Sequence, residues 1–310
     1  MAGRWRKQRS AALAAVMWLA SQPATAADAI VVGSKIDTEG ALLCPLVSIA
    51  LKAHGIPVIE KCGTGATQVV RKALLAGEID AYPEYTGNAP YLIKNVRFAP
   101  GTFRDPLRGH AAGAAADLQQ NGIVWLQPAP ANVTYGFAIP ARLAAAERIA
   151  TLAQLAAYIN AGKPFKAVVS QEFVDRADGL KAFEHAYGFQ LKPSQLIILP
   201  GGNTAQTESA AARGTSGANA AMSYSTDGQL SALGLVSLCD GGAAADIYQP
   251  LLTIRSAALK KYPAVPAIVD PVFATLDTAT LSRLNAQIVV GGLPGAQVAE
   301  QYLRQKGFIK

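Results

Sequence analysis

Residues 78–88 read EIDAYPEYTGN and residues 33–40 read GSKIDTEG, and these two stretches decide the fold. The first is a short apolar strand that runs into a turn rich in Pro, Gly and Tyr. The second is the end of a strand followed by the start of a helix. Both place polar and aromatic side chains at the carboxyl ends of predicted strands, which is where open α/β sheets bind ligands. We therefore expect a ligand site there.

The segment between the two stretches alternates between strand and helix patterns. Apolar runs predict strands at residues 29–33, 57–60 and 79–82, and helical spacing predicts helices at 38–54 and 67–76. Pro45 falls inside the first helix, so that helix either starts near it or kinks there. Thr67 is expected to cap the second helix and Gly77 to end it. The β-α-β-α-β alternation predicts a layered, mostly parallel α/β sheet.

A second set of elements follows a proline-rich linker at residues 127–130. The same patterns predict a helix at 111–121 and a strand at 123–126 before the linker. After it they predict strands at 135–139, 167–169, 196–199 and 220–224, and helices at 152–160, 178–187, 278–288 and 295–306. A polar turn at 225–228 follows the last of these strands. The pattern alone indicates two α/β units.

The first 27 residues have the organisation of a secretory signal peptide. Its basic part contains Arg4, Arg6, Lys7 and Arg9. An apolar stretch at 11–20 and small residues at 24–26 follow, and no Cys follows the apolar stretch that would indicate a lipoprotein. The alternative, a transmembrane anchor, requires roughly 20 apolar residues, and this stretch is shorter. We expect a soluble periplasmic protein.

Composition excludes several classes of protein. Of the 310 residues 51% are hydrophobic and 16% are charged, so the chain can build substantial cores and is not disordered. The signal segment holds four basic residues and no acidic ones, so its removal lowers the net charge from +7 to +3. That charge is too small to indicate a nucleic-acid partner, and no basic run supports one.

The chain has three cysteines, which allow at most one internal disulfide in an oxidising compartment. Cys44 lies near the start of the first predicted helix and Cys62 at the end of the second predicted strand. These points are close together in a βαβ unit, so we predict a Cys44–Cys62 bridge; the alternative is two small buried thiols. Cys239 would be left over.

Several short motifs, taken in order, resemble the osmoprotectant-binding proteins of ABC importers, which capture glycine betaine, choline or carnitine. The motifs lie at residues 33–39, 71–87, 134–135, 172–179 and 224–228, and residues 36–40 and 85–88 are most similar to the OsmF/YehZ branch of that family. The resemblance covers nearly the whole chain after the signal segment, and only the order and spacing of the motifs together are specific.

The resemblance implies a bilobed periplasmic binding protein, type II-like, with two α/β lobes joined by two hinge crossings. The implied parts are a signal peptide at 1–27, a first lobe at 28–130 plus 226–310, and an inserted second lobe at 131–225. The crossings would lie near 127–132 and 225–228. It further implies a monomer that delivers its solute to ABC permease subunits and needs no cofactor.

Three tyrosines stand where this family places an aromatic cage: Tyr85, Tyr135 and Tyr224. A quaternary ammonium donates no hydrogen bond and is too bulky for a tight ion pair, so aromatic faces are what select it. A lone tyrosine is more often a half-buried core residue. Three in this motif context, from both lobes or their crossings, favour a cage that the ligand closes.

The carboxylate of glycine betaine or carnitine requires cationic or amide donors. Lys35 and Arg176 match family positions that serve this purpose, Arg by bidentate geometry and Lys as a point charge. Asn88 offers an amide. The alternative roles for Lys35 and Arg176 are surface charges or a salt bridge between the lobes.

One departure from the family concerns a fourth cage tyrosine, which high-affinity relatives carry before the return crossing. That region here is residues 204–207, and no tyrosine lies between Tyr187 and Tyr224. A desolvated cation–π contact contributes roughly 2 kcal/mol, or about thirtyfold in affinity. We therefore expect weak glycine betaine binding.

Two other functions compete with transport. An enzyme is disfavoured because the three histidines have no metal-binding spacing and no nucleophile–base motif is present, so we expect neither catalytic nor metal-ligating residues. A periplasmic sensor that binds another small polar ligand has the same sequence features as a transport component and stays an alternative.

Overall fold

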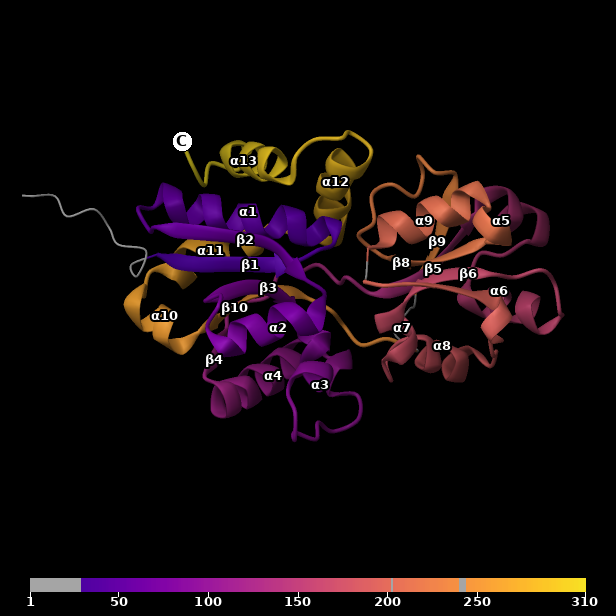
Figure 1. Ribbon diagram of the computed structural model, residues 1–310, viewed down its shortest axis with the longest axis horizontal. Helices are drawn as coiled ribbons and strands as arrows, with labels where there is room; N and C mark the ends of the chain where they lie inside the picture. Colours follow the sequence, from indigo (N-terminus) through magenta and orange to yellow (C-terminus); the bar gives the residue numbers. More distant parts are fainter. Residues whose placement is uncertain (1–28, 202, 240–243) are drawn as a thin grey trace, which may run out of the picture.

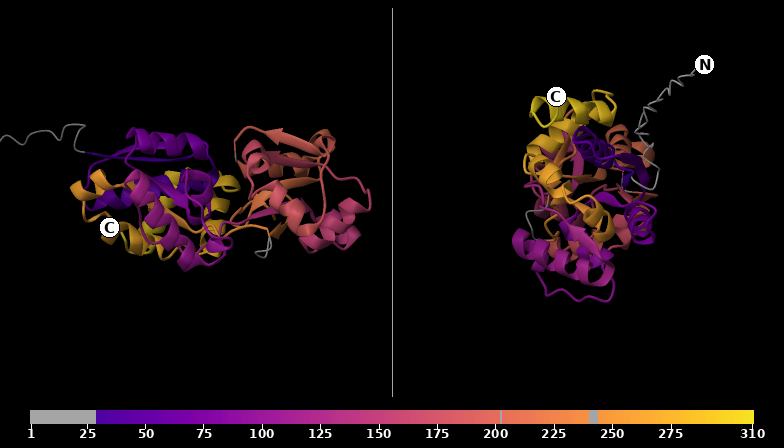
Figure 2. Two further views of the ribbon diagram at one scale, coloured as in Figure 1. Left: turned by 90° about the horizontal axis from the view of Figure 1, so that it is seen from below. Right: turned by 90° about the vertical axis from the view of Figure 1, so that its left-hand side faces the viewer.

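The computed structural model describes residues 29–201, 203–239 and 244–310, which form two α/β lobes side by side (Figure 1). The predicted signal peptide at 1–27 lies outside the described residues. The view from below shows the same two bodies next to each other (Figure 2, left). The expected bilobed α/β architecture is confirmed by two separate five-stranded sheets, each covered by helices.

The sheet of the first lobe has the strand order β2-β1-β3-β10-β4. These strands are β1 (Ile30–Lys35), β2 (Val58–Gly65), β3 (Ala81–Tyr85), β4 (Ile123–Trp125) and β10 (Pro250–Arg255). The pairs that β1 forms with β2 and β3 are parallel, whereas β10 is antiparallel to both β3 and β4. The lobe therefore combines the expected parallel βαβαβ segment with one late strand that runs the other way.

Helices cover both faces of this sheet, with α1 and α13 on one side and α2 and α4 on the other (Figure 1). The helices of the lobe are α1 (Thr38–Ala53), α2 (Thr67–Ala76), α3 (Ala89–Leu92), α4 (Pro106–Asn121), α10 (Ser256–Lys261), α11 (Val265–Phe273), α12 (Thr278–Val289) and α13 (Gly295–Gln305).

The second lobe has the strand order β7-β6-β8-β5-β9. Its strands are β5 (Tyr135–Pro140), β6 (Ala167–Ser170), β7 (Leu196–Leu199), β8 (Ala220–Tyr224) and β9 (Leu235–Cys239). Its helices are α5 (Ala141–Glu147), α6 (Leu152–Asn160), α7 (Gln171–Asp175), α8 (Leu180–Tyr187) and α9 (Thr204–Arg213). As in the first lobe, parallel pairs occupy one side of the sheet and antiparallel pairs the other.

The ends of α1 and α2 agree only in part with the ends predicted from the sequence. The first helix runs unbroken through Pro45 and is capped by Asp37, whose carboxylate accepts a 2.6 Å hydrogen bond from Gly40 N. The prediction of a cap at Thr67 is wrong, because the cap residue of α2 is Ala66, which makes no side-chain capping bond. Gly77 ends α2 in the left-handed conformation, as expected.

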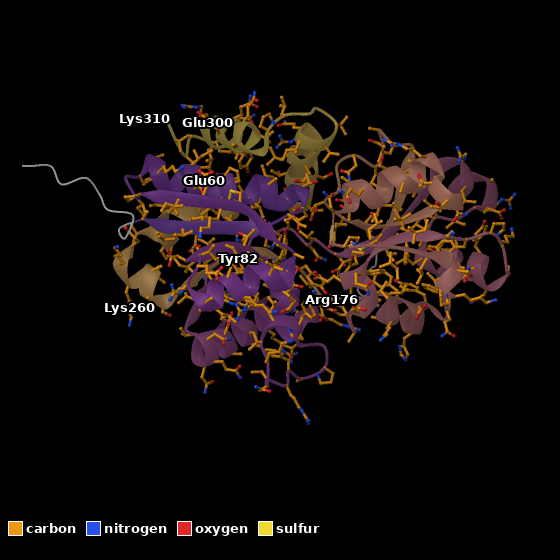
Figure 3. The ribbon with its side chains drawn as sticks, viewed as in Figure 1. Glu60, Tyr82, Arg176, Lys260, Glu300 and Lys310 are labelled. Carbon is orange, nitrogen blue, oxygen red and sulfur yellow. A yellow bond between two sulfur atoms is a disulfide. The ribbon has the colours of Figure 1, made fainter. Side chains whose placement is uncertain are left out.

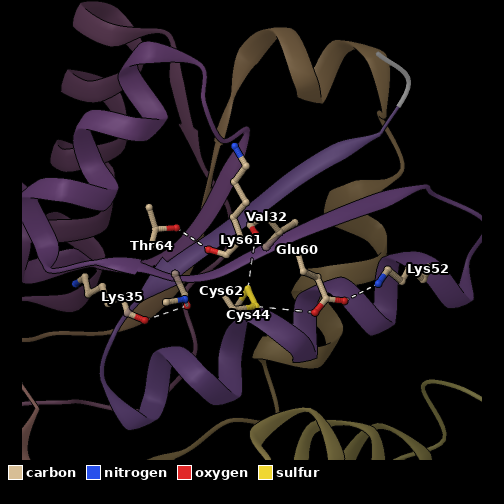
Figure 4. The surroundings of a disulfide bond; sticks show 10 residues. Val32, Lys35, Cys44, Lys52, Glu60, Lys61, Cys62 and Thr64 are labelled. Atoms are coloured by element: carbon tan, nitrogen blue, oxygen red, sulfur yellow. Dashed lines mark hydrogen bonds and ion pairs between the residues drawn. A yellow bond between two sulfur atoms is a disulfide. The ribbon is translucent and has the colours of Figure 1, made fainter. Parts of the chain in front are cut away.

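The predicted disulfide is present and joins α1 to β2 (Figure 4). Cys44 and Cys62 are separated by 18 positions in the sequence, and their Cα atoms lie 5.7 Å apart. Cys44 is fully buried, whereas Cys62 lies on the exposed edge strand. Cys239 is outside this bond and is exposed on β9.

The chain crosses between the lobes twice, once between β4 and β5 and once between β9 and β10. The crossings run side by side: Val133 N donates to Tyr248 O at 2.9 Å, and Tyr248 N donates to the Asn132 side chain at 2.8 Å. The first crossing agrees with the expected position near 127–132.

The expected return crossing at 225–228 is incorrect, because residues after it belong to the second sheet. The turn contacts the first lobe, where Gly228 lies so close to α12 that an added Cβ would meet Ser282 O at 2.3 Å. The chain then turns back and forms β9, which pairs with β5 along its whole length. A polar turn that only contacts the other lobe has the same sequence pattern as a crossing that carries the chain into that lobe.

Among the described residues, no helix has the length and apolar character needed to cross a membrane.

Candidate functional site

A cavity lies between the two lobes, beside the crossings, with about 720 Å³ of empty space that includes its open mouth. Its walls come from the carboxyl ends of β1, β3 and β8, the amino end of β5, the starts of α1, α2, α7 and α9, both crossings, and α12. The lining residues are 35–39, Ala66, Thr67, Tyr85, Asn88, Val133, Tyr135, Glu172, Thr204, Tyr224, Thr226, Asp227, Tyr248 and Asn285. The carboxyl ends of β1, β3 and β8 therefore meet at this cavity, as expected for an α/β ligand site.

Three tyrosine rings form one corner of the cavity. The ring of Tyr135 lies 5.1 Å from that of Tyr224, tilted by 37°, and 5.6 Å from that of Tyr248, at 80°. Phe173 supports Tyr135 from the core of the second lobe, with ring centroids 5.1 Å apart. The nearly perpendicular rings present aromatic faces in more than one direction, which is the arrangement that attracts a bulky cation.

Tyr248 lines the cavity but was not predicted from the sequence, where a fourth cage tyrosine was expected only before β8. It lies on the second crossing, two residues before β10, and Gly87 leaves the space for its ring: an added Cβ would meet Tyr248 Cδ1 at 2.7 Å. A fourth tyrosine therefore lines the cavity, from another part of the chain than expected. Thr204, where the fourth tyrosine was expected, does line the cavity.

Tyr85 lines the cavity from the first lobe, and its hydroxyl is fixed by a buried carboxyl group. The Tyr85 hydroxyl donates to Glu39 Oε1 at 2.7 Å, and Asn285 Nδ2 donates to Glu39 Oε2 at 3.2 Å. Burial raises the pKa of Glu39 to about 7, opposed by its hydrogen bond from Tyr85. Burial likewise raises the pKa of Tyr85 well above its usual value. The tyrosine thus stays neutral, with its hydroxyl turned toward Glu39.

Lys35 is the one cationic side chain among the lining residues, and it is held by a buried glutamate. Its ammonium lies 2.6 Å from Glu84 Oε1 and 4.5 Å from the centroid of the Tyr85 ring. Glu84 is fully buried and also accepts from Tyr82 OH at 2.8 Å and from Asn88 Nδ2 at 2.6 Å. This carboxylate therefore positions two of the predicted ligand residues, although the sequence analysis did not select it.

Arg176 does not line the cavity but joins the two lobes beside it (Figure 3). Its guanidinium forms a fork with Asp178, at 2.8 and 2.5 Å, and donates to Asn88 Oδ1 at 2.7 Å and to Glu172 Oε1 at 3.1 Å. It also lies 4.4 Å from the centroid of the Tyr91 ring. The ion pairs of Arg176 with Glu172 and Asp178 lie within the second lobe, so they are not the inter-lobe salt bridge considered from the sequence; a hydrogen bond to the uncharged Asn88 reaches the first lobe.

Carboxyl groups outnumber cations on the cavity walls. Asp37, Glu39, Glu172 and Asp227 all line it, against the single Lys35. Burial raises the pKa of Asp37, and the nearby Lys35 opposes that shift. Negative groups beside aromatic faces make the cavity more attractive to a cation than to an anion.

Five of the six predicted ligand residues thus line one cavity: Lys35, Tyr85, Asn88, Tyr135 and Tyr224. The missed residues are Glu39, Glu84 and Tyr248. Two of them lie inside the stretches quoted at the outset, but a carboxylate that holds a neighbour leaves the same sequence pattern as an exposed one. Tyr248 carries the signal used for the other tyrosines, a position next to a strand, but that strand was not predicted.

Comparison with known proteins places this geometry in a family. Residues 28–305 match the family described as the substrate binding domain of ABC-type glycine betaine transport systems. The chain is 46% identical over 290 residues to the glycine betaine-binding protein YehZ of Escherichia coli K12, and the match covers 94% of each chain.

Solved structures agree. The structure of apo YehZ from Escherichia coli superimposes with a TM-score of 0.68 at 45% identity, over 90% of this chain and 99% of that one. A glycine betaine/carnitine/choline ABC transporter structure gives a TM-score of 0.70 at 18% identity, over 91% and 100%, and so shows the same fold. Substrate-binding proteins of ABC importers lie in the periplasm or outside the cell. The chain belongs to the family of substrate-binding domains of ABC-type glycine betaine transport systems.

Proposed function

We propose that this protein captures a quaternary-ammonium solute of the glycine betaine or choline type in the inter-lobe cavity and delivers it to an ABC permease. The observation that carries the proposal is the set of four tyrosines on the cavity walls, one from the first lobe, two from the second and one from the crossing between them. A ligand that touches rings from both lobes favours the closed arrangement, because it gains those contacts only there.

Tyr85, Tyr135, Tyr224 and Tyr248 hold the trimethylammonium group. Their rings present negative faces to the spread positive charge. The excess of carboxyl groups around them adds attraction for the cation and opposes an anionic solute.

Lys35 and Asn88 serve the carboxylate end of a betaine. Lys35 is 7% exposed and lines the cavity, and its bond to Glu84 fixes the direction of the ammonium group. Arg176 acts instead as a positioning residue that orients the Asn88 amide from the second lobe. A solute without a carboxylate, such as choline, would leave these groups unused.

The presence of Tyr248 removes the reason for expecting weak glycine betaine binding. The expectation rested on a missing ring, and Tyr248 supplies a ring at the same cavity. We therefore propose binding that uses the complete cage, by a monomer in the periplasm that performs no catalysis.

Isothermal titration calorimetry of the protein without residues 1–27 tests the proposal, with glycine betaine, choline and carnitine as ligands. Saturable binding that Tyr135→Ala or Tyr224→Ala weakens at least tenfold is the expected result. Tyr262→Ala is the control, since Tyr262 follows α10 and is not among the lining residues. No heat with any of the three ligands, with the protein folded, would refute the assignment.

A further inference from the structure

Two carboxyl groups, those of Asp227 and Glu208, lie side by side at one wall of the cavity, and no role has been proposed above for Glu208. Asp227 lines the cavity just after β8. Glu208 lies in α9, one turn after Thr204, and is fully buried. It lies beside Asp227, because Asp227 accepts a hydrogen bond from Thr204, one turn earlier in α9, and Glu208 accepts one from Gln229, two residues after Asp227. The ligand cavity therefore has a buried acid pair directly behind one of its walls.

The other hydrogen bonds of the pair leave one oxygen without a donor. Asp227 Oδ1 accepts from Thr204 Oγ1 at 2.7 Å, and Asp227 Oδ2 accepts from Tyr224 N at 2.6 Å. Glu208 Oε2 accepts from the Gln229 amide. Glu208 Oε1 has no donor within the described part of the chain. A buried carboxylate oxygen in that position is costly unless it carries a proton.

A proton on Glu208 Oε1 satisfies both groups at once. Two ionised carboxylates repel each other and cannot donate, whereas a proton on one of them can be donated to the other. Burial and the adjacent carboxyl group both raise the pKa of Glu208, and burial also raises that of Asp227. Asp37, on the loop before α1, adds a further like charge to Asp227.

We propose that Glu208 and Asp227 share one proton in the empty cavity and that the cationic group of a bound solute displaces it. The inference rests on the proposed function, since it requires a cation in the cavity. A positive charge beside Asp227 stabilises the doubly ionised pair, which the empty protein avoids. The displaced proton leaves to solvent, and the solute takes over its role of neutralising the pair.

Linkage fixes the sign and size of the effect. If binding releases one proton, solute affinity rises with pH by up to about tenfold per pH unit while the empty pair stays protonated. Glu39 also lines the cavity with a raised pKa, so it contributes a second release near pH 7. Lys35 and Glu172 are the remaining lining groups that carry charge, together with Asp37.

Calorimetry with glycine betaine in two buffers of different ionisation enthalpy measures the released protons directly. We expect close to one proton per bound solute from the pair at about pH 8, where Glu39 is already ionised. Glu208→Gln keeps the shape of the side chain and donates an amide to Asp227, so it should bind solute with no proton release at that pH. Glu39→Gln should keep the release.

The outcomes separate the two proposals. Binding with no proton release at about pH 8, or with a release that persists in Glu208→Gln, overturns the shared proton and leaves the proposed function intact. If Glu208→Gln does not fold, Asp227→Asn replaces it, with the same expected loss of release.

An infrared spectrum of the ligand-free protein tests the shared proton without any solute. It should show the C=O stretch of a buried protonated carboxyl group at about pH 8, and either substitution should remove it. Absence of that band from the wild-type spectrum overturns the shared proton even if no solute binds. Failure of every solute to bind overturns the proposed function and, with it, the displacement step.

Discussion

Arg176 Nη1 of the second lobe lies 2.7 Å from Asn88 Oδ1 of the first, and through this bond the two lobes share one polar network. The Asn88 amide donates a hydrogen bond to Glu84, and Glu84 also accepts one from Lys35. On the other side, the Arg176 guanidinium is fixed by Asp178. The network runs beside the cavity from one lobe to the other, so anything that separates the lobes must break it.

Arg176→Ala should therefore lower the free energy of unfolding and also weaken solute binding. Removing one partner from a buried ion pair leaves the other uncompensated, which costs about 3–5 kcal/mol. Arg304→Ala is the matched control, because its pair with Glu300 is about half exposed and contributes at most about 0.5 kcal/mol. Urea unfolding followed by circular dichroism measures the unfolding free energy of the two variants, and calorimetry measures their solute binding. Equal losses in the two variants would contradict the structural role of Arg176.

Substitutions of Tyr248 separate the contribution of its ring from that of its hydroxyl. Tyr248→Ala removes one cage face and should weaken glycine betaine binding by roughly thirtyfold, the equivalent of a cation–π contact of about 2 kcal/mol. Tyr248→Phe keeps the face but loses the 2.6 Å hydrogen bond to Asp178, so it should cost less affinity than Tyr248→Ala. Calorimetry at one pH ranks the variants. Unchanged affinity in Tyr248→Ala would remove this residue from the cage.

The sequence predicted the cavity largely because its residues follow strands that are locally recognisable. The strands at 196–199 and 220–224 were predicted with the bounds they have, and Tyr85, Tyr135 and Tyr224 reach the cavity from strand ends. A short apolar run next to a turn contains this information by itself, so no distant contact is needed to find it.

What the sequence did not show depends on pairing between distant segments. β3 ends at Tyr85, beyond the predicted residue 82, because β10 pairs with it from Ala81 to Tyr85. The partner residue of Tyr85 is Pro250, 165 positions later in the chain, so no local pattern marks the extension. Glu84 was missed, and Arg176 was assigned to the ligand, for the same reason: the role of each depends on partners that only the folded chain brings close.

Glu39 should make stability fall as pH rises. Its pKa is about 7 in the folded protein against 4.5 for the unperturbed group, so between these values the folded state holds the proton more tightly than the unfolded one. Stability from this group is complete below about pH 4.5 and is lost by about pH 7, by on the order of 3 kcal/mol.

Glu39→Gln removes that dependence, and urea unfolding of both proteins at several pH values between about 5 and 8 tests it. The wild type should lose stability relative to the variant as pH rises through this range. Parallel curves would show that Glu39 titrates alike in the folded and unfolded states.

The disulfide should account for much of the stability of the first lobe. A double substitution, Cys44→Ala with Cys62→Ala, should lower the unfolding free energy by about 3 kcal/mol, since the bridge closes a loop of 18 positions. Reductant should destabilise the wild type to a similar extent and leave the double variant unchanged. Cys239→Ser is the control and should respond to reductant as the wild type does.

The position of β10 sets the order in which the two halves of the molecule can be completed. It joins β3 to β4, yet its residues, 250–255, follow all five strands of the second sheet in the chain. A polypeptide that becomes available from its N-terminus can therefore finish the inserted lobe while the first sheet is still in two pieces. The inserted lobe can thus be completed first and the lobe that contains the N-terminal strands last. A chain cut short before residue 250 has all the strands of the second sheet but lacks β10, which joins the two parts of the first.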